Sequence, residues 1–333
     1  MPVPPDQLEA LRSRGCVVTG GLGFIGSNLV HHLRGLGVPV RVVDAVVAEH
    51  GANRRNIEGL DVDVLETDVG DPRVAPFLRD VSHVFNLAGQ VSHTASMTDP
   101  VRDLELNAIT HARFLEMLRA ENPTARVVHT STRQVYGRVD RLPVDEHTAA
   151  RPIDVNGVAK LAGEHLHMVY SHAHRMPITS LRLTNVYGPR QRLTSDEIGF
   201  LPVFVRKALQ GETIELFGGG EQRRDCLFVD DVVDAILTAT APAALGRVYN
   251  VGHVRSHSLD EIARALTKLA DTGSQVISTP WPPIHRRIDI GSFETDSSAI
   301  RTELGWVATT DLEDGLCRTL DFYREHPWYL SST

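Results

Sequence analysis

The stretch VVTGGLGFIGSNLVHHL, residues 17–33, joins a short apolar run to an amphipathic segment through three spaced glycines. Gly20, Gly23 and Gly26 form the pattern GxxGxxG between a predicted strand and a predicted helix that begins near Phe24. Glycines allow a tight turn and a close approach of the backbone to a pyrophosphate. The helix start then presents free N–H groups and the positive end of its dipole to that phosphate. The stretch therefore predicts a dinucleotide-binding strand-turn-helix unit.

Short apolar runs alternate with amphipathic stretches from residue 15 to about residue 185. The runs predicted as buried strands are CVVTG (16–20), VPVRVVD (38–44), VDVLETD (62–68), HVFNLAG (83–89), ARVVHTST (125–132) and ITSLRLTNVYG (178–188). Apolar strands separated by helices indicate βαβ units and a parallel sheet covered on both faces. The fold class is therefore α/β, a doubly wound parallel sheet of Rossmann type with a smaller mixed α/β lobe for the substrate.

The domain boundary is predicted near residue 185. Residues 14–185 carry the alternating pattern, whereas residues 186–333 are more irregular and include the clusters FGGGEQ and TPWPPIH. The run CLFVDDVVDAILTAT again has the pattern of a strand end that continues into a helix. We therefore expect a segment near residues 226–252 to return to the first domain, while the remainder forms the smaller lobe.

Composition excludes several classes of protein. The chain has 333 residues, a formal net charge of −8 and scattered basic residues, which argues against nucleic acid or an anionic membrane as a partner. No run approaches the roughly 18 apolar residues of a membrane span, so a cytoplasmic location is expected. Cys16, Cys226 and Cys317 form no CxxC pair, which predicts buried free thiols and no metal cluster.

Acidic and apolar residues at later strand ends extend the predicted dinucleotide site. Asp44 ends the second strand about 20 residues after the glycines, where an acid suits the free ribose hydroxyls of NAD and repels the extra phosphate of NADP. Asp68 and Val69 follow the third strand and are expected to flank an adenine ring. The predicted NAD-binding residues are Gly20, Gly23, Phe24, Ile25, Gly26, Asp44, Asp68, Val69, Leu87, Ala88 and Gly89. The alternative, a simple turn followed by an acidic loop residue, does not explain strand, turn, helix and acid together.

Eight motifs along the chain occur in the order typical of one protein family. They are TGGLGFIGS, NLAGQ, HTSTRQVYG, NGVAKLAGE, LRLTNVYGP, RRDCLFVDDVV, YNVGH and DSSAIRTELGW. Over nearly its whole length the chain resembles the extended short-chain dehydrogenase/reductase family, and in particular its nucleotide-sugar epimerases and dehydratases. The resemblance implies that the larger lobe holds NAD and the smaller lobe a nucleoside diphosphate sugar. It also implies a homodimer formed through the helices predicted near residues 101–120 and 156–174.

The same resemblance assigns roles to five residues. Thr132 takes the position of the hydroxyl that hydrogen-bonds the reacting sugar oxygen, and Lys160 that of the lysine which binds the nicotinamide ribose. Asn185 resembles the residue that steadies the diphosphate. Arg224 and Arg286 resemble the arginines that clamp it, because a planar guanidinium suits phosphate. For each arginine a solvated surface charge is the alternative.

The chain departs from the family pattern at two places. Arg133 and Gln134 stand where the dehydratases carry an Asp-Glu pair, and neither can exchange protons near neutral pH, so ordinary dehydration is disfavoured. We expect both residues, with Gln90, to contact substrate. Asn156 stands where the family has its catalytic tyrosine, and a neutral amide can orient a hydroxyl without removing its proton.

Two residues are candidates for the missing base. His93 follows the fourth strand and has a suitable unperturbed pKa of roughly 6.5. Lys160 would serve if burial and a positive nicotinamide depressed its pKa. The tyrosines offer less, because Tyr136 and Tyr187 lie in structural VYG motifs and Tyr170 lies far along the helix.

These observations predict an NAD-dependent epimerase that transiently oxidises a carbon of a nucleoside diphosphate sugar and returns the hydride to the other face. No metal is expected. Two alternatives remain open. One is a variant dehydratase or dehydrogenase of the same sugars, and the other is a protein that binds NAD and the sugar but has lost turnover.

Overall fold

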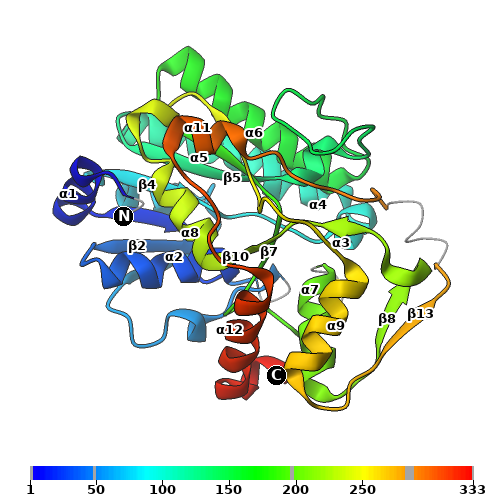
Figure 1. Ribbon diagram of the computed structural model, residues 1–333. Coiled ribbons are helices and arrows are strands. Elements are labelled where there is room, and N and C mark those ends of the chain that lie inside the picture. The colour runs from blue at the N-terminus through cyan, green and yellow to red at the C-terminus, as the bar shows by residue number, and fades with distance from the viewer. Residues whose placement is uncertain (1–2, 48–49, 196–198, 282–288, 332–333) are drawn as a thin grey trace.

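A seven-stranded parallel sheet dominates the computed structural model, which describes residues 3–47, 50–195, 199–281 and 289–331 (Figure 1). The strand order is β11-β6-β5-β4-β1-β2-β3. The strands are β1 (Cys16–Thr19), β2 (Val40–Asp44), β3 (Asp63–Glu66), β4 (His83–Asn86), β5 (Arg126–Thr132), β6 (Ile178–Leu183) and β11 (Val248–Val251). Every pairing in this sheet is parallel, which confirms the predicted doubly wound α/β class.

Helices lie on both faces of this sheet and in the second half of the chain. They are α1 (Pro5–Arg14), α2 (Phe24–Gly35), α3 (His93–Thr98), α4 (Pro100–Leu104), the π-helical turn η4 (Glu105–Ile109), α5 (Thr110–Glu121), α6 (Val155–His174), α7 (Phe200–Gln210), α8 (Val229–Thr238), α9 (Leu259–Ala270), α11 (Ser298–Leu304) and α12 (Leu312–Glu325). None of the helices within the described ranges is long and apolar enough to cross a membrane.

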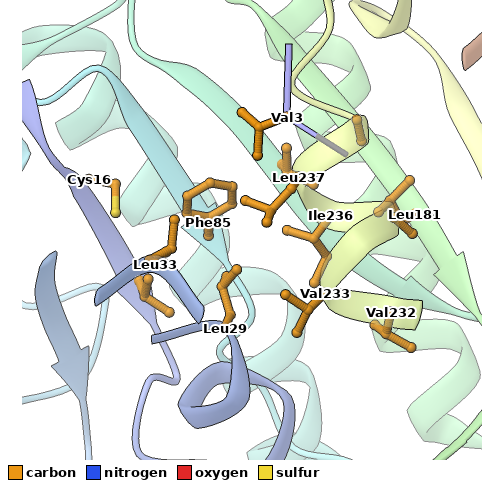
Figure 2. Close-up of a cluster of buried hydrophobic side chains, with 14 of the residues drawn as sticks. Val3, Cys16, Leu29, Leu33, Phe85, Leu181, Val232, Val233, Ile236 and Leu237 are labelled. Carbon is orange, nitrogen blue, oxygen red and sulfur yellow. The ribbon is translucent and has the colours of Figure 1, made fainter. Parts of the chain in front are cut away.

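Alternation along the strands divides the core into two layers. Figure 2 shows Cys16 of β1 and Phe85 of β4 on the side of the sheet that packs against Leu29 and Leu33 of α2 and Ile236 of α8. Successive side chains of a strand point to opposite faces. The next residue of β1, Val17, therefore belongs to the second layer, which α5 covers through Phe114, Leu115 and Leu118. Both layers are apolar because both faces of a parallel sheet are buried.

Three two-stranded sheets and α7, α9 and α12 make up most of the remaining structure. The pairs are β7 (Asn185–Tyr187) with β10 (Cys226–Phe228), β8 (Ile214–Phe217) with β13 (Val276–Thr279), and β9 (Arg223–Arg224) with β12 (His257–Ser258). Some elements from this half of the chain belong to the large sheet or its helices instead, and α11 also contacts β11. β11 pairs with β6 at the edge, and α8 packs beside α2.

The run at residues 178–188, predicted as one strand, forms two. β6 ends at Leu183, and β7 begins at Asn185 in a different sheet. Thr184 lies between them, and its N–H donates to the carbonyl of Val251 while its hydroxyl donates to the Asp225 carboxylate at 2.7 Å. These bonds turn the chain from the large sheet towards β10.

Two further expectations were wrong. β3 is not a buried strand, because it lies at the edge of the sheet and three of its four residues are exposed. Cys317 is exposed on α12, whereas Cys16 and Cys226 are the buried free thiols that we expected. Near the N-terminus, where the sequence analysis predicted no element, residues Pro5–Arg14 form α1, and its Leu8 and Leu11 are buried.

The close packing of Gly26 generates the first prediction. A Cβ at this position would lie 2.1 Å from the backbone oxygen of Gly20, whereas a Cβ at Gly35 in the same helix would meet nothing within 4 Å. We expect Gly26→Ala to lower the free energy of unfolding by about 1–3 kcal/mol through overpacking. Gly35→Ala should leave it unchanged or raise it by up to about 1 kcal/mol. Denaturant unfolding of both variants measures the difference, and equal effects would contradict this packing.

Candidate functional site

A cavity of about 410 Å³ lies at the carboxyl ends of the large sheet. It includes the point between β1 and β4 where the strand order reverses, which is the usual ligand position in open α/β sheets. The cavity brings together all the predicted NAD-binding residues and most of the predicted catalytic and substrate-binding residues. The latter are Gln90, His93, Thr132, Arg133, Gln134, Asn156, Lys160 and Asn185.

The glycine turn is shaped for a group that lies close to the backbone. Gly20 has φ +69°, a left-handed conformation that glycine adopts without strain. Gly23 precedes α2, and no side chain caps the N–H groups of its first turn. An apolar helix start without a side-chain cap and with its backbone open to the cavity fits a pyrophosphate.

Acidic residues at the ends of β2 and β3 complete this part of the cavity. The Asp44 carboxylate accepts hydrogen bonds from the N–H groups of Leu22, at 3.0 Å, and Val46, at 2.8 Å. Asp44 therefore also fixes the glycine turn, and burial raises its pKa. Asp68 accepts from the N–H of Gly70 at 2.8 Å. An acid at the tip of β2 beside a glycine turn fits the adenosine ribose of NAD.

Asn156 is buried in the cavity wall, with its amide engaged by the protein. Its Nδ2 donates to Gln90 Oε1 at 2.9 Å, to the Gln90 carbonyl at 3.2 Å and to Asp103 Oδ1 at 3.2 Å. Its backbone N–H donates to Ser96. Asn156 therefore connects the start of α6 to Gln90 and to α4, and it has no group that could accept a proton near neutral pH.

Asp103 was not predicted from the sequence. It is 2% exposed, and Oδ1 also accepts from Asn107 Nδ2 at 3.2 Å, while Oδ2 is buried without a hydrogen-bond partner. Asn107 lies in the π-helical turn η4, and its Oδ1 accepts from the N–H of Gln90. An acid four residues before an asparagine in a helical stretch was the available signal, but that spacing also suits an ordinary surface pair.

Lys160 lies behind Gly89, where an added Cβ would approach its Nζ to 2.5 Å. Burial lowers the pKa of Lys160 to about 8, although the nearby Asp103 carboxylate acts in the opposite direction. An amine with this pKa is mostly an ammonium at pH 7, so Lys160 is equipped to donate hydrogen bonds to a ligand in the cavity.

His93 forms a hydrogen-bonded pair with Asp154, a second residue missed by the sequence analysis. His93 Nδ1 lies 2.8 Å from Asp154 Oδ2, and His93 Nε2 lies 2.8 Å from Gln134 Nε2. Burial alone would raise the pKa of Asp154. Its hydrogen bond with His93, the charge of His93 and the N–H of Gly157 outweigh that effect, and the pKa lies below the usual value. An ionised Asp154 only accepts, so His93 donates from Nδ1, and in the neutral ring Nε2 then carries the lone pair.

Asp154 also caps α6, since its Oδ1 accepts from the N–H of Gly157 at 2.7 Å. An aspartate directly before a helix with a small residue three positions later is a recognisable capping pattern. That pattern was present in the sequence, and it accounts for one oxygen of the carboxylate. The contact of the other oxygen with His93 depends on the path of the loop after β4, which the sequence does not specify.

Thr132 ends β5, and its side chain caps the 3-10 helix η5 (Arg133–Tyr136) by accepting from the N–H of Gln134. Arg133 donates from Nη2 to Asn185 Oδ1 at 3.0 Å. These contacts place Thr132, Arg133 and Asn185 along one wall of the cavity.

The structure describes one of the two arginines expected to clamp a diphosphate, Arg224. Arg224 does not line the cavity, and its Nη1 donates to the backbone carbonyls of Arg223 and Gly291. Arg286 lies outside the described residues. The phosphate role of Arg224 and Arg286 therefore stays a prediction.

Three buried histidines beneath the cavity have nitrogen atoms within 4.8 Å of one another, namely His111, His129 and His167. The amide of Asn86 occupies two of these nitrogens, with Nδ2 at 3.1 Å from His111 Nδ1 and 2.9 Å from His167 Nε2. Burial lowers the pKa of all three histidines, so they are neutral. The three histidines therefore form a neutral network, held together in part by the Asn86 amide, and we assign it a structural role.

The link between Asp103 and Lys160 gives a second prediction. The chain contains only three lysines, Lys160, Lys207 and Lys268, so ¹³C labelling at lysine Cε should give three resolvable resonances. We expect one to titrate near pH 8, and its loss in Lys160→Arg would assign it. Asp103→Asn should lower this midpoint further, because the carboxylate favours the ammonium form. An unchanged midpoint in Asp103→Asn would contradict the electrostatic link.

Comparison with known proteins gives consistent results. Residues 16–252 match the model of the NAD dependent epimerase/dehydratase family. A UDP-glucose 4-epimerase of Mycolicibacterium smegmatis is 32% identical over 92% of this chain and 98% of its own length. The UDP-glucose 4-epimerase of Thermotoga maritima, solved with UDP-glucose, is 30% identical with a TM-score of 0.85 and covers 94% of this chain and 99% of that chain. MoeE5, solved with UDP-glucuronic acid and NAD, is 28% identical with a TM-score of 0.82 over 93% of this chain and 98% of that chain. The chain therefore belongs to the NAD-dependent epimerase/dehydratase family.

Proposed function

We propose that this protein is an NAD-dependent nucleoside diphosphate sugar epimerase in which His93, and not a tyrosine, accepts the proton of the reacting hydroxyl. The observation that carries the proposal is the His93–Asp154 pair, at 2.8 Å, in the same cavity as Thr132, Lys160 and the glycine turn. A histidine oriented by a carboxylate is a common arrangement for a general base.

In this mechanism the protein binds the sugar and moves one proton. Bound NAD supplies a reversible hydride acceptor for the sugar carbon. Thr132 hydrogen-bonds the reacting oxygen, and His93 Nε2 takes its proton once the sugar hydroxyl replaces the amide of Gln134. Asp154 stabilises the resulting imidazolium, as an acidic partner does in other carboxylate-histidine pairs. The same nitrogen returns the proton when the sugar turns its other face.

Lys160 and Asn156 act by binding in this mechanism. Lys160 holds the nicotinamide ribose through its ammonium group. Asn156 holds Gln90 and Asp103 in place at the start of α6. Epimerisation is favoured over dehydration because Arg133 and Gln134, which follow Thr132, offer no acid-base pair. The relatives named as UDP-glucose 4-epimerases support the same choice.

The third prediction tests the reaction itself. The protein, with and without added NAD, is incubated with UDP-, dTDP-, GDP- and CDP-sugars in deuterated water, and products are identified by mass spectrometry and proton NMR. We expect an isomer of unchanged mass without solvent deuterium, because the carbon-bound hydrogen is retained. Incorporated deuterium would point to proton exchange beside a carbonyl and would contradict the mechanism. Binding without any product would favour the alternative of a protein that has lost turnover.

Variants of two histidines test the base in the same assay. His93→Gln should lower kcat by roughly 10²- to 10⁴-fold, the usual contribution of general acid-base catalysis, with little change in NAD binding. His165→Gln on the exposed face of α6 is the matched control and should retain activity. If His93→Gln turned over as fast as the unaltered protein, His93 would not be the base.

We also infer a homodimer formed through α4, η4, α5 and α6, which pack side by side. Apolar side chains remain exposed on these elements, including Val101 at 65%, Val158 at 47% and Val169 at 55%. Val158 and Val169 are three helical turns apart and therefore lie on one face of α6. Paired helices of a second copy would cover these side chains.

The fourth prediction concerns this interface. Val101→Asp should shift the protein from dimer to monomer, since it places a charge in an apolar contact. Val254→Asp, at a position that is also 65% exposed but on the loop after β11, should have no such effect. Light scattering after size-exclusion chromatography measures both masses. A monomeric unaltered protein would rule out the interface.

A further inference from the structure

We propose that Arg133 binds a carboxylate on the sugar, so that the preferred substrates are nucleoside diphosphate sugar acids. This inference rests on the proposed function and specifies its substrate class. It starts from the chemistry of the cavity wall next to Thr132, where the structure places a guanidinium group that the epimerase mechanism does not use.

The guanidinium of Arg133 is held in place but not neutralised. Nη2 donates to Asn185 Oδ1 at 3.0 Å, and the group lies 5.2 Å from the centre of the Phe293 ring. Nη1 is buried without a hydrogen-bond partner. No carboxylate among the described residues forms an ion pair with Arg133 within 4.0 Å, although most arginines at the surface of this chain have such a partner.

The charges around Arg133 leave it in need of an anion. Burial and the nearby Arg224 lower its pKa to about 9. Asp225 acts in the opposite direction, but its carboxylate accepts a hydrogen bond from Thr184 and forms no ion pair with Arg133 within 4.0 Å. Asp154 is committed to His93 and to the N–H of Gly157. A buried cation without a partner is costly, and an anionic ligand would remove that cost.

The position of Arg133 points to the sugar as the source of the anion. Its chain neighbours are Thr132, expected at the reacting oxygen, and Gln134, whose amide contacts His93 at 2.8 Å. Because all three residues line the same cavity, we place the carboxylate on a carbon close to the reacting one. A planar guanidinium also forms two parallel hydrogen bonds with a carboxylate. The diphosphate is the other possible source, and the experiment separates the two.

Binding measurements on three ligands test the inference. Isothermal titration calorimetry of the NAD-loaded protein with UDP, UDP-glucose and UDP-glucuronic acid compares ligands that share the nucleotide and differ in the carboxylate. We expect UDP-glucuronic acid to bind about 10-fold or more tightly than UDP-glucose. Arg133→Gln should lower the affinity for UDP-glucuronic acid by about 10- to 100-fold, as the loss of one charged hydrogen bond implies. The affinities for UDP and UDP-glucose should fall by less than about threefold.

The control is Arg79→Gln, which removes an exposed arginine paired with Glu121 at the opposite end of the strands and should change none of the three affinities. If Arg133→Gln lowered the affinities for UDP, UDP-glucose and UDP-glucuronic acid equally, Arg133 would bind the diphosphate and the inference would fail. It would also fail if the unaltered protein bound both sugars alike. If the protein preferred UDP-glucuronic acid over UDP-glucose but converted neither, only the proposed epimerase activity would be contradicted. If it epimerised sugars but bound UDP-glucose and UDP-glucuronic acid equally well, only this inference would be contradicted.

Discussion

A buried hydrogen bond between Thr19 and Asn86 joins the ends of β1 and β4, where the cavity opens. Thr19 Oγ1 donates to Asn86 Oδ1 at 2.7 Å and accepts from the N–H groups of Leu87 and Ala88, at 3.1 and 3.2 Å. One hydroxyl thereby joins the ends of β1 and β4 and holds the first two residues of the loop that follows β4. The glycine turn follows Thr19 directly and the segment from Leu87 to Gln90 follows Asn86. Both walls of the cavity therefore depend on this contact.

The same asparagine connects the sheet to α5 and α6, two helices with residues that line the cavity. Its amide donates to His111 of α5 and His167 of α6. The ring of His167 stacks on that of His129 in β5, with ring centres 3.9 Å apart. Charged imidazoles here would repel one another without compensation, and burial keeps them neutral. The amide can donate to two of them because they are neutral, and the bond to His167 helps to hold α6, which carries Asn156 and Lys160, against the sheet.

Local sequence signals predicted the fold, and they selected residues that the structure brings together at one end of the cavity. The glycine turn, Asp44 and the ends of β3 and β4 depend on strand-turn-helix units that lie close together in the chain, and the cavity includes every one of those residues. The contacts that the sequence analysis did not predict join segments that lie far apart in the chain. Asp154 meets His93 across 61 residues, and Asp103 meets Asn156 across 53. Neither contact follows from periodicity, and Thr184 at the end of β6 likewise bonds to Asp225, 41 residues farther along the chain.

The two candidate bases differ in whether they can still accept a proton beside their acidic neighbours. Asp103 favours the protonated form of Lys160, and an ammonium cannot accept another proton. Asp154 acts on neutral His93 through the Nδ1 hydrogen, which leaves the lone pair of Nε2 available and stabilises the cation that forms after proton transfer. Both carboxylates favour the protonated form of their neighbour, but Lys160 already carries its proton at pH 7, whereas the Nε2 lone pair of a neutral His93 can still accept one. This difference assigns binding to Lys160 and proton transfer to His93 in the proposed mechanism, in which Asn156 takes no part in proton transfer.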